Sequence, residues 1–436
     1  MKRKFLSLCA LLFAINLLIT AQVQRIEINT ASIPANAEIK LKLVQRFQQY
    51  NKKTVHSSDR FDTTINSPKS VNILDQSDKF YVHSLEGCRT SVYRLSDFKL
   101  LKSIPHVFNA SNQYLFKETD YFDYKYRTKD KNLNYFSGKP VESCFSHNGK
   151  YLWVTYYRRT YDLNAIDPSA VCIIDTEADT IVRVMPTAPL PKMISCSPDN
   201  RTIAVTHWGD NTIALIDIQS ENPADFKYLK NIAIDRRLSL NFAENDTIDR
   251  DNNCGNCLRG TVFTPDNKYV LVGKMGSNSV AVVDVDAQKH IGSIFGMKNN
   301  MRHLIISKGK LYLSINKTGY VQKADLKDLL LFNESGKKNK TYSKWQSAFV
   351  GEGARTIVAD PTGNYIFVAA NNKSLISVVR TSDMKVVAQC PADSYPVGMD
   401  ISSDGKTLIV TSQGKSGDGG NSVMVYKIEY SQKSML

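Results

Sequence analysis

The sequence predicts an all-β fold built from repeated antiparallel sheets, and two recurring features support this prediction. One is a tight turn rich in Pro, Asp and Asn or Gly, which occurs as Ser197-Pro198-Asp199-Asn200, Thr264-Pro265-Asp266-Asn267, Asp360-Pro361-Thr362-Gly363 and Ser403-Asp404-Gly405, with a weaker copy at Ser146-His147-Asn148-Gly149. Proline sets φ near the start of such a turn, and Asn or Gly tolerates the left-handed position that closes it. The other is a constant spacing, since three copies span 17 residues from the last turn residue to a charged residue ahead. This constant register indicates one structural unit repeated in tandem.

Each turn is followed by two apolar segments that have the composition of β-strands. The segments at 203–206, 269–272 and 365–368 are rich in β-branched and aromatic residues, and the next ones end at Asp217, Asp284 and Arg380. Such composition between turn signals is typical of strands. Two degenerate copies, near 81–94 and 311–323, bring the total to seven.

A fourth strand follows most copies, but the last copy ends near Tyr430 after three strands. An unassigned segment at 39–47 alternates apolar and polar residues and can supply the missing strand. That pairing would close a ring and remove exposed sheet edges. We therefore predict a seven-bladed β-propeller of four-stranded antiparallel blades, closed by an N-terminal strand. The expected blades are 69–106, 139–188, 189–234, 259–297, 299–333, 352–392 and 394–430.

Two repeat segments carry a family resemblance. The residues from Asn211 to Asp217, NTIALID, and from Asn278 to Asp284, NSVAVVD, resemble the YVTN-type β-propeller repeat. The resemblance covers nearly the whole mature chain, although the first and fifth copies depart strongly from the pattern. It implies an extracytoplasmic seven-bladed ring, a fold used by surface-layer-like and nucleic-acid-binding proteins and related to lactonase propellers. It indicates a fold more than a function, because propellers host unrelated activities.

The N-terminus has the pattern of a secretory signal peptide over residues 1–22. Lys2, Arg3 and Lys4 precede an apolar run that ends at Ile19, and small residues follow the run. The run is shorter than the ~20 residues that a membrane span needs. We expect a single propeller domain over 23–436, without a transmembrane span, that is monomeric and periplasmic, cell-surface or secreted.

Seven cysteines follow this leader, an odd number that cannot all pair within the chain. Cys254 and Cys257 form a C-x-x-C in a loop rich in Gly and Asn. Attachment of a c-type haem requires a His directly after the second Cys, and no His follows Cys257. No second C-x-x-C is present to complete a zinc site. A local disulfide is the preferred interpretation, with free thiols as the alternative. The acidic stretch at 246–251 lacks the EF-hand pattern, so we expect no metal and no cofactor.

Long insertions are expected on one face of the ring. The segments 108–135, 156–168 and 235–258 all connect strands or blades on the side where second strands lead into third strands. Long loops in compact folds are usually functional or disordered. We therefore expect Tyr156, Tyr157, Arg158 and Trp208 to contact a ligand on this face.

A second signal comes from aligning the copies by their turns. Lys192, Arg259, Arg302 and Arg355 then occupy one equivalent position at the start of the innermost strand, and Val141 and Val397 occupy it in the second and seventh copies. These cations are expected to form an arc at the mouth of the central channel. Converging cations repel one another, and the chain carries a formal net charge of +14, so a bound anion is favoured. The alternative is neutralisation by carboxylates such as Glu142 or Glu352.

These features favour an exported, non-enzymatic binding protein. Its expected ligand is an anionic small molecule, a polysaccharide, a single-stranded nucleic acid or a protein segment at the channel mouth. One alternative is a lactonase-like or lyase-like hydrolytic enzyme that uses Glu142, His207 and His303 for acid–base chemistry. No nucleophile elbow, HExxH, Walker loop or dinucleotide fingerprint occurs in the sequence. A second alternative is a protein-interaction scaffold or surface-layer-like protein.

Overall fold

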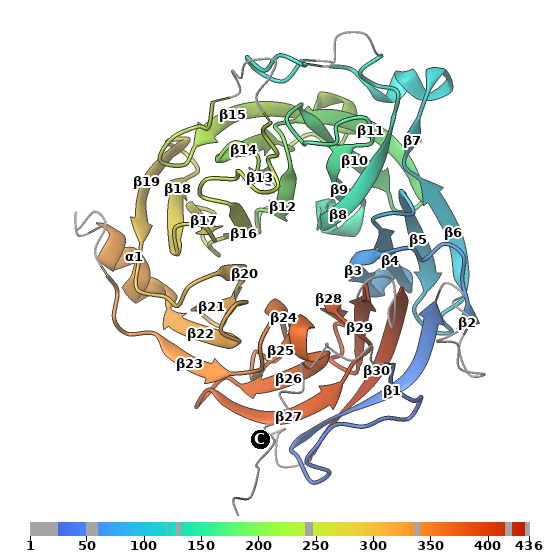
Figure 1. Cartoon of the computed structure of the whole chain (residues 1–436), viewed down its shortest axis with the longest axis vertical. Coiled ribbons are helices and arrows are strands. Elements are labelled where there is room, and N and C mark those ends of the chain that lie inside the picture. The colour runs from blue at the N-terminus through green and yellow to red at the C-terminus, as the bar shows by residue number, and fades with distance from the viewer. Residues whose placement is uncertain are drawn as a thin grey trace, which may run out of the picture.

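The computed structural model describes residues 25–48, 60–118, 120–127, 132–239, 247–334, 341–414 and 421–431, so the expected signal peptide lies outside the described residues. Seven antiparallel sheets stand in a ring around a central axis (Figure 1). This arrangement confirms the predicted seven-bladed β-propeller. In the described part of the chain, no helix is long and apolar enough to cross a membrane.

Four strands form each blade, and the first strand of each blade lies innermost in the ring (Figure 1). Blades one to three comprise β3 (Pro68–Leu74), β4 (Lys79–Ser84), β5 (Arg89–Arg94) and β6 (Leu100–Pro105); β8 (Phe136–Ser146), β9 (Tyr151–Arg159), β10 (Ser169–Asp175) and β11 (Thr180–Thr187); and β12 (Pro191–Cys196), β13 (Thr202–His207), β14 (Thr212–Asp217) and β15 (Lys227–Ala233). Blades four and five comprise β16 (Leu258–Phe263), β17 (Tyr269–Lys274), β18 (Ser279–Asp284) and β19 (Lys289–Ile294); and β20 (Met301–Ser307), β21 (Lys310–Ile315), β22 (Tyr320–Asp325) and β23 (Gln346–Phe349). Blades six and seven comprise β24 (Ala354–Ala359), β25 (Tyr365–Ala370), β26 (Leu375–Arg380) and β27 (Lys385–Pro391); and β28 (Pro396–Ile401), β29 (Thr407–Ser412), β30 (Ser422–Tyr430) and β1 (Ile39–Gln48). Two short strands, β2 (Arg60–Phe61) and β7 (Val107–Phe108), extend the sheets of blades seven and two.

The recurring turns adopt the backbone conformation that their residues favour. Asn200, Asn267 and Gly363 have φ values of 58°, 62° and 67°, in the left-handed region. The backbone N–H of each donates to a carbonyl three residues earlier at 2.9 Å. The turn residues therefore fix the hairpin between the first and second strands of each of these blades.

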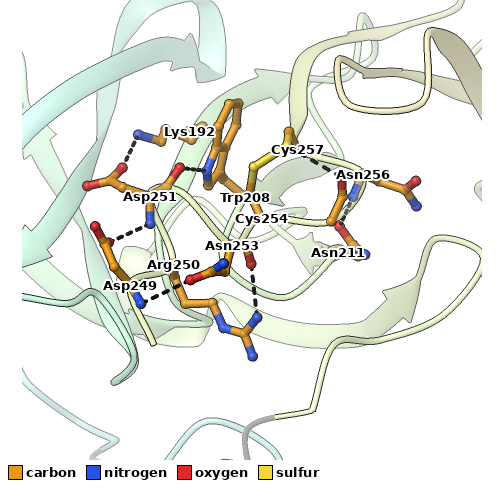
Figure 2. The surroundings of a disulfide bond; sticks show 11 residues. Lys192, Trp208, Asn211, Asp249, Arg250, Asp251, Asn253, Cys254, Asn256 and Cys257 are labelled. Atoms are coloured by element: carbon orange, nitrogen blue, oxygen red, sulfur yellow. Dashed lines mark hydrogen bonds and ion pairs between the residues drawn. A yellow bond between two sulfur atoms is a disulfide. The ribbon is translucent and has the colours of Figure 1, made fainter. Parts of the chain in front are cut away.

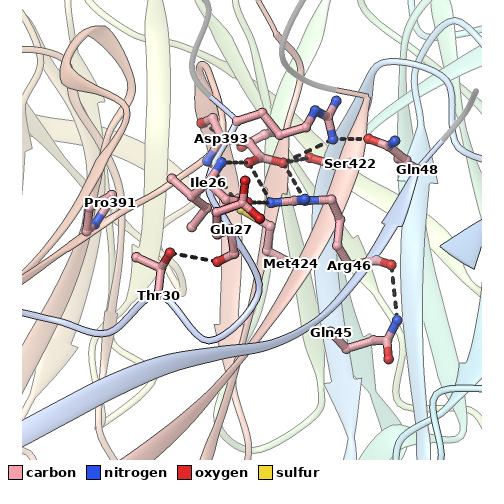
Figure 3. Close-up of polar contacts among 12 residues, drawn as sticks. Ile26, Glu27, Thr30, Gln45, Arg46, Gln48, Pro391, Asp393, Ser422 and Met424 are labelled. Carbon is pink, nitrogen blue, oxygen red and sulfur yellow. Dashed lines mark hydrogen bonds and ion pairs between the residues drawn. The ribbon is translucent and has the colours of Figure 1, made fainter. Parts of the chain in front are cut away.

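The N-terminal strand closes the ring as predicted. β1 pairs antiparallel with β30, from Ile39 opposite Tyr430 to Gln48 opposite Ser422, and Figure 1 shows the blue strand beside the red one. A buried ion pair reinforces this closure (Figure 3), because Arg46 Nε of β1 lies 2.9 Å from Asp393 Oδ2 and both side chains are fully buried. The same carboxylate accepts hydrogen bonds from Ser422 Oγ at 2.7 Å and from the backbone N–H of Ile26 at 3.0 Å. One carboxylate thus joins the two ends of the chain.

The fifth blade departs from the expected pattern. Helix α1 (Leu326–Glu334) follows β22 and buries Leu326 and Leu329 against the core. The fourth strand, β23, therefore lies beyond the expected limit of 333. Because the helix is inserted before β23, this strand comes later in the sequence than expected, but it still belongs to the sheet of blade five.

The aromatic insertion at 108–135 packs largely onto the ring. Its Tyr121 and Tyr124 are buried in a cluster that also contains Trp153 and Phe226. Phe122, in contrast, is exposed. Much of the aromatic content of this insertion therefore extends the core.

Candidate functional site

A β-bulge recurs at the same level in all seven innermost strands. In β24, for example, the pairing register with β25 shifts between Ala354 and Ile357, and the other six inner strands shift at the corresponding place. Bulges re-aim side chains and are common beside functional sites. In each inner strand, the residue directly after the last one paired before this register shift lies within the bulge, and we call its place the bulge position. In ring order, the seven bulge positions hold Lys69, Val141, Lys192, Arg259, Arg302, Arg355 and Val397. Five of these seven positions are therefore cationic.

All seven bulge positions except Val397 line one axial cavity of about 380 Å³. We call it the axial cavity; its other lining residues are Leu85, Glu86, Lys139, Glu142, Tyr157, Arg158, Tyr395 and Gln413. These residues lie near the bulges of first strands, at the ends of second strands, in the loops that follow second strands or, for Tyr395, directly before a first strand. The cavity therefore opens on the face that carries the insertions, and the four cations grouped by the turn alignment do come together there.

Ion pairs neutralise only part of this charge. Lys192 Nζ lies 3.4 Å from Asp251 Oδ1, and Arg259 Nη2 lies 3.9 Å from Glu142 Oε1. Among the ion pairs between described residues, none includes Lys69, Arg302 or Arg355. Glu352, weighed as a possible counter-charge, pairs instead with Lys373 at 3.4 Å.

Burial and mutual repulsion make the charged state of these cations costly. Burial lowers the pKa of Lys192 to about 7 against the opposing effect of Asp251, and it lowers the pKa of Arg259 to about 10. Burial also lowers the pKa of Lys69 and of Arg302, and the charges of Arg355 and Arg259 lower both further. An anion in the cavity would offset this repulsion.

A loop from the third-to-fourth blade connection holds Lys192 in place (Figure 2). Its Asp251 pairs with the lysine and accepts, through its backbone carbonyl, a 3.2 Å hydrogen bond from Trp208 Nε1. The Lys192 ammonium lies 3.7 Å from the centroid of the Tyr157 ring. Trp208 is buried and packs beside the cysteines of this loop, so it supports the wall of the cavity behind Lys192.

The C-x-x-C belongs to the same loop. The structure joins Cys254 and Cys257 in a disulfide, with their Cα atoms 4.8 Å apart (Figure 2). The five other described cysteines are free thiols. The disulfide staples the loop that places Asp251 against Lys192.

Two predicted site residues are fully buried and do not line the axial cavity. Tyr156 is fully buried, and its hydroxyl lies 2.7 Å from His106 Nδ1, because the alternation of β9 directs it into the core between blades. His207 is also fully buried; its Nδ1 lies 2.9 Å from Thr212 Oγ1, and burial lowers its pKa to about 3. These findings correct the expectation that Tyr156 contacts a ligand on the face of the ring and that His207 is placed for acid–base chemistry there.

The remaining catalytic candidates do not form an acid–base pair that lines the cavity. Glu142 lines it, whereas His303, the neighbour of Arg302, does not. The Nδ1 of His303 accepts a 3.3 Å hydrogen bond from the backbone of Ile357, and burial lowers its pKa to about 4. Among the described residues, no group of three or more His, Cys, Asp or Glu side chains is placed to hold a metal ion.

Several cavity residues were missed at the sequence level. Lys69 was missed because the first copy lacks the recurring turn on which the alignment rests. A usable signal was present, however, since a proline precedes the bulge position at Pro68, Pro140, Pro191 and Pro396. Tyr395 and Gln413 lie in loops, as does Asp251, the partner of Lys192, and the repeat gives no register there.

Solved structures resemble this chain in fold. Kuenenia stuttgartiensis hydrazine synthase superposes with a TM-score of 0.58 at 14% identity, covering 88% of this chain and 100% of that one. The β-propeller domain of Myceliophteria thermophila Cps50 (Swd1) superposes with a TM-score of 0.55 at 9% identity, covering 83% of this chain and 97% of that one. No protein-family model matches the sequence, and no curated protein matches it significantly. At these identities the likeness shows the propeller fold alone.

Proposed function

We propose that this chain is an exported binding protein that holds an anionic ligand in the axial cavity. The observation that carries the proposal is the convergence of five cations, from five separate blades, on one cavity. Three of the five, Lys69, Arg302 and Arg355, take part in no ion pair between described residues. Arginine forks recognise carboxylates and phosphates through paired hydrogen bonds, so the cavity has the donors that such groups require.

Export and a distant relationship to YVTN-type propellers belong to the same proposal. The basic and apolar leader supports export. The disulfide between Cys254 and Cys257 is compatible with an oxidising compartment. The NTIALID and NSVAVVD segments support the relationship. Export is tested by sequencing the N-terminus of the secreted protein, which we expect to begin near Gln22 or Val23.

Charge removal in the cavity tests the binding function. We expect the double variant Arg259→Ala, Arg302→Ala to lose the salt-sensitive binding of anions that the unaltered protein shows in calorimetry with citrate and pyrophosphate. Lys227→Ala, Lys385→Ala is the matched control, because both lysines are largely exposed on outer strands and the loss of charge is the same. Equal binding by the cavity variant and the control would reject the site, as would the absence of binding by every anion tested.

A further inference from the structure

We infer that the ligand of the axial cavity is a small multivalent anion with at least two ionised groups, and not a polymer lying across the face of the ring. This inference rests on the proposed function and narrows it to a class of ligand. Its first support is the size of the cavity. The cavity of about 380 Å³ lies near the lower end of the ~300–1,000 Å³ range typical of small-molecule sites.

The arrangement of the cations agrees with a compact ligand. Proteins that bind single strands use cations along a groove together with exposed aromatic platforms for the bases. Here the cations converge from inner strands on opposite sides of the axis (Figure 1). Tyr121 and Tyr124 of the nearby insertion, which could have stacked on bases, are buried in the core.

The charge balance sets the minimum charge of the ligand. Seven Lys and Arg side chains line the cavity against two carboxylates, Glu86 and Glu142. Asp251, which pairs with Lys192 and Arg158, adds a third. Counted as formal charges, four positive charges therefore remain uncompensated, and a monoanion would leave three of them facing one another in a partly desolvated space.

The positions of the cavity arginines and of Lys69 require more than one anionic group. Arg259, Arg302 and Arg355 come from the consecutive blades four, five and six, whereas Lys69 comes from blade one. Val397 of blade seven separates Lys69 from Arg355 along the ring. In addition, Arg302 Nε is buried and has no hydrogen-bond partner among the residues that the structure describes. One ionised group of the ligand can bind these three arginines while a second ionised group binds Lys69.

Calorimetry on the mature chain at constant ionic strength tests this class. The probes are citrate for polycarboxylates, pyrophosphate for phosphates, acetate as a monoanion, and a twelve-residue oligothymidylate as a polymer. We expect citrate or pyrophosphate to bind at least tenfold more tightly than acetate and than the oligothymidylate. Whichever of the two binds more tightly distinguishes carboxylate from phosphate chemistry. Tight oligothymidylate binding, or acetate binding equal to that of both multivalent anions, would overturn the inference.

Two variants test whether the ligand contacts both sides of the cavity, the side of Lys69 and the side of the arginines. Lys69→Met is expected to reduce the affinity for the preferred multivalent anion at least tenfold while changing acetate binding less. Arg302→Lys keeps the charge but removes the guanidinium fork, and it is expected to weaken the multivalent anion severalfold; unchanged melting shows that each variant is folded. If Lys69→Met weakens acetate and the multivalent anion equally, the two-group inference fails although the anion site stands. If no anion binds the unaltered protein, the proposed function itself fails.

Discussion

At the scale of single residues, the chemistry of the site is set by cations held where charge is costly. Lys192 illustrates the balance, because burial opposes its charge while Asp251 and the Tyr157 ring favour it. Arg259 and Arg302 add repulsion from the cavity side. A bound anion would stabilise the charged ammonium form of Lys192, so anion binding and protonation of Lys192 are coupled.

That coupling predicts a pH dependence of binding. Burial lowers the pKa of Lys192 to about 7, so the side chain is mostly charged at pH 6 and mostly neutral at pH 8. Anion affinity should therefore fall as pH rises, by up to about tenfold between these values, since one pKa unit corresponds to a factor of ten. Calorimetry with citrate at pH 6, 7 and 8 measures this fall.

Lys192→Met is the matched variant for the pH series. It should bind more weakly at pH 6 and show a much flatter profile, because it removes the group assigned to the transition. An unchanged pH profile in this variant would show that a group other than Lys192 titrates. An affinity of the unaltered protein that rises with pH would contradict the assignment.

At the scale of elements, the recurring turn made most of the fold predictable. Its Pro, Asp and Asn or Gly residues require a particular backbone, and the copies that keep it also keep a constant register. Equivalent positions could therefore be aligned, and four of the five cations of the inner strands were found. Lys69 was missed where the turn has degenerated, even though β3 carries the same bulge as the other inner strands.

The errors at this scale have a common physical origin. β9 runs on to Arg159, so the residues expected in a loop at 156–159 belong to a strand instead. In this strand Tyr156 and Arg159 are buried, whereas Tyr157 and Arg158 are half-buried and line the cavity. Likewise, the contact of Asp251 with Lys192 joins segments 59 residues apart, and no local pattern encodes such a contact.

At the scale of the whole molecule, closing the ring brings the inner strands of seven blades around one axis. Closure depends on β1, which supplies the outermost of the four strands of blade seven from the other end of the chain. Arg46 and Asp393 add a fully buried charged contact to this seam (Figure 3). The seam therefore contributes to the stability of the ring on which the site depends.

We predict that Asp393→Ala strongly destabilises the protein. It leaves Arg46 buried without its carboxylate, and removing one partner of a buried pair typically costs about 3–5 kcal/mol. The free energy of unfolding, measured by denaturant titration, reports the loss. Glu221→Ala is the control, because its ion pair with Lys150 is solvent-exposed and its loss should matter far less. Comparable losses in the two variants would show that the seam is not specially stabilised by this contact.

The central claim is that cations from separate blades form one anion site on the axis. Anomalous diffraction from crystals of the mature protein soaked in selenate tests it most directly, because selenium locates the anion independently of any activity. We expect a peak inside the axial cavity, within hydrogen-bonding reach of the Arg259, Arg302 and Arg355 side chains. Selenate bound only on the outer surface, with the cavity containing none, would contradict the claim.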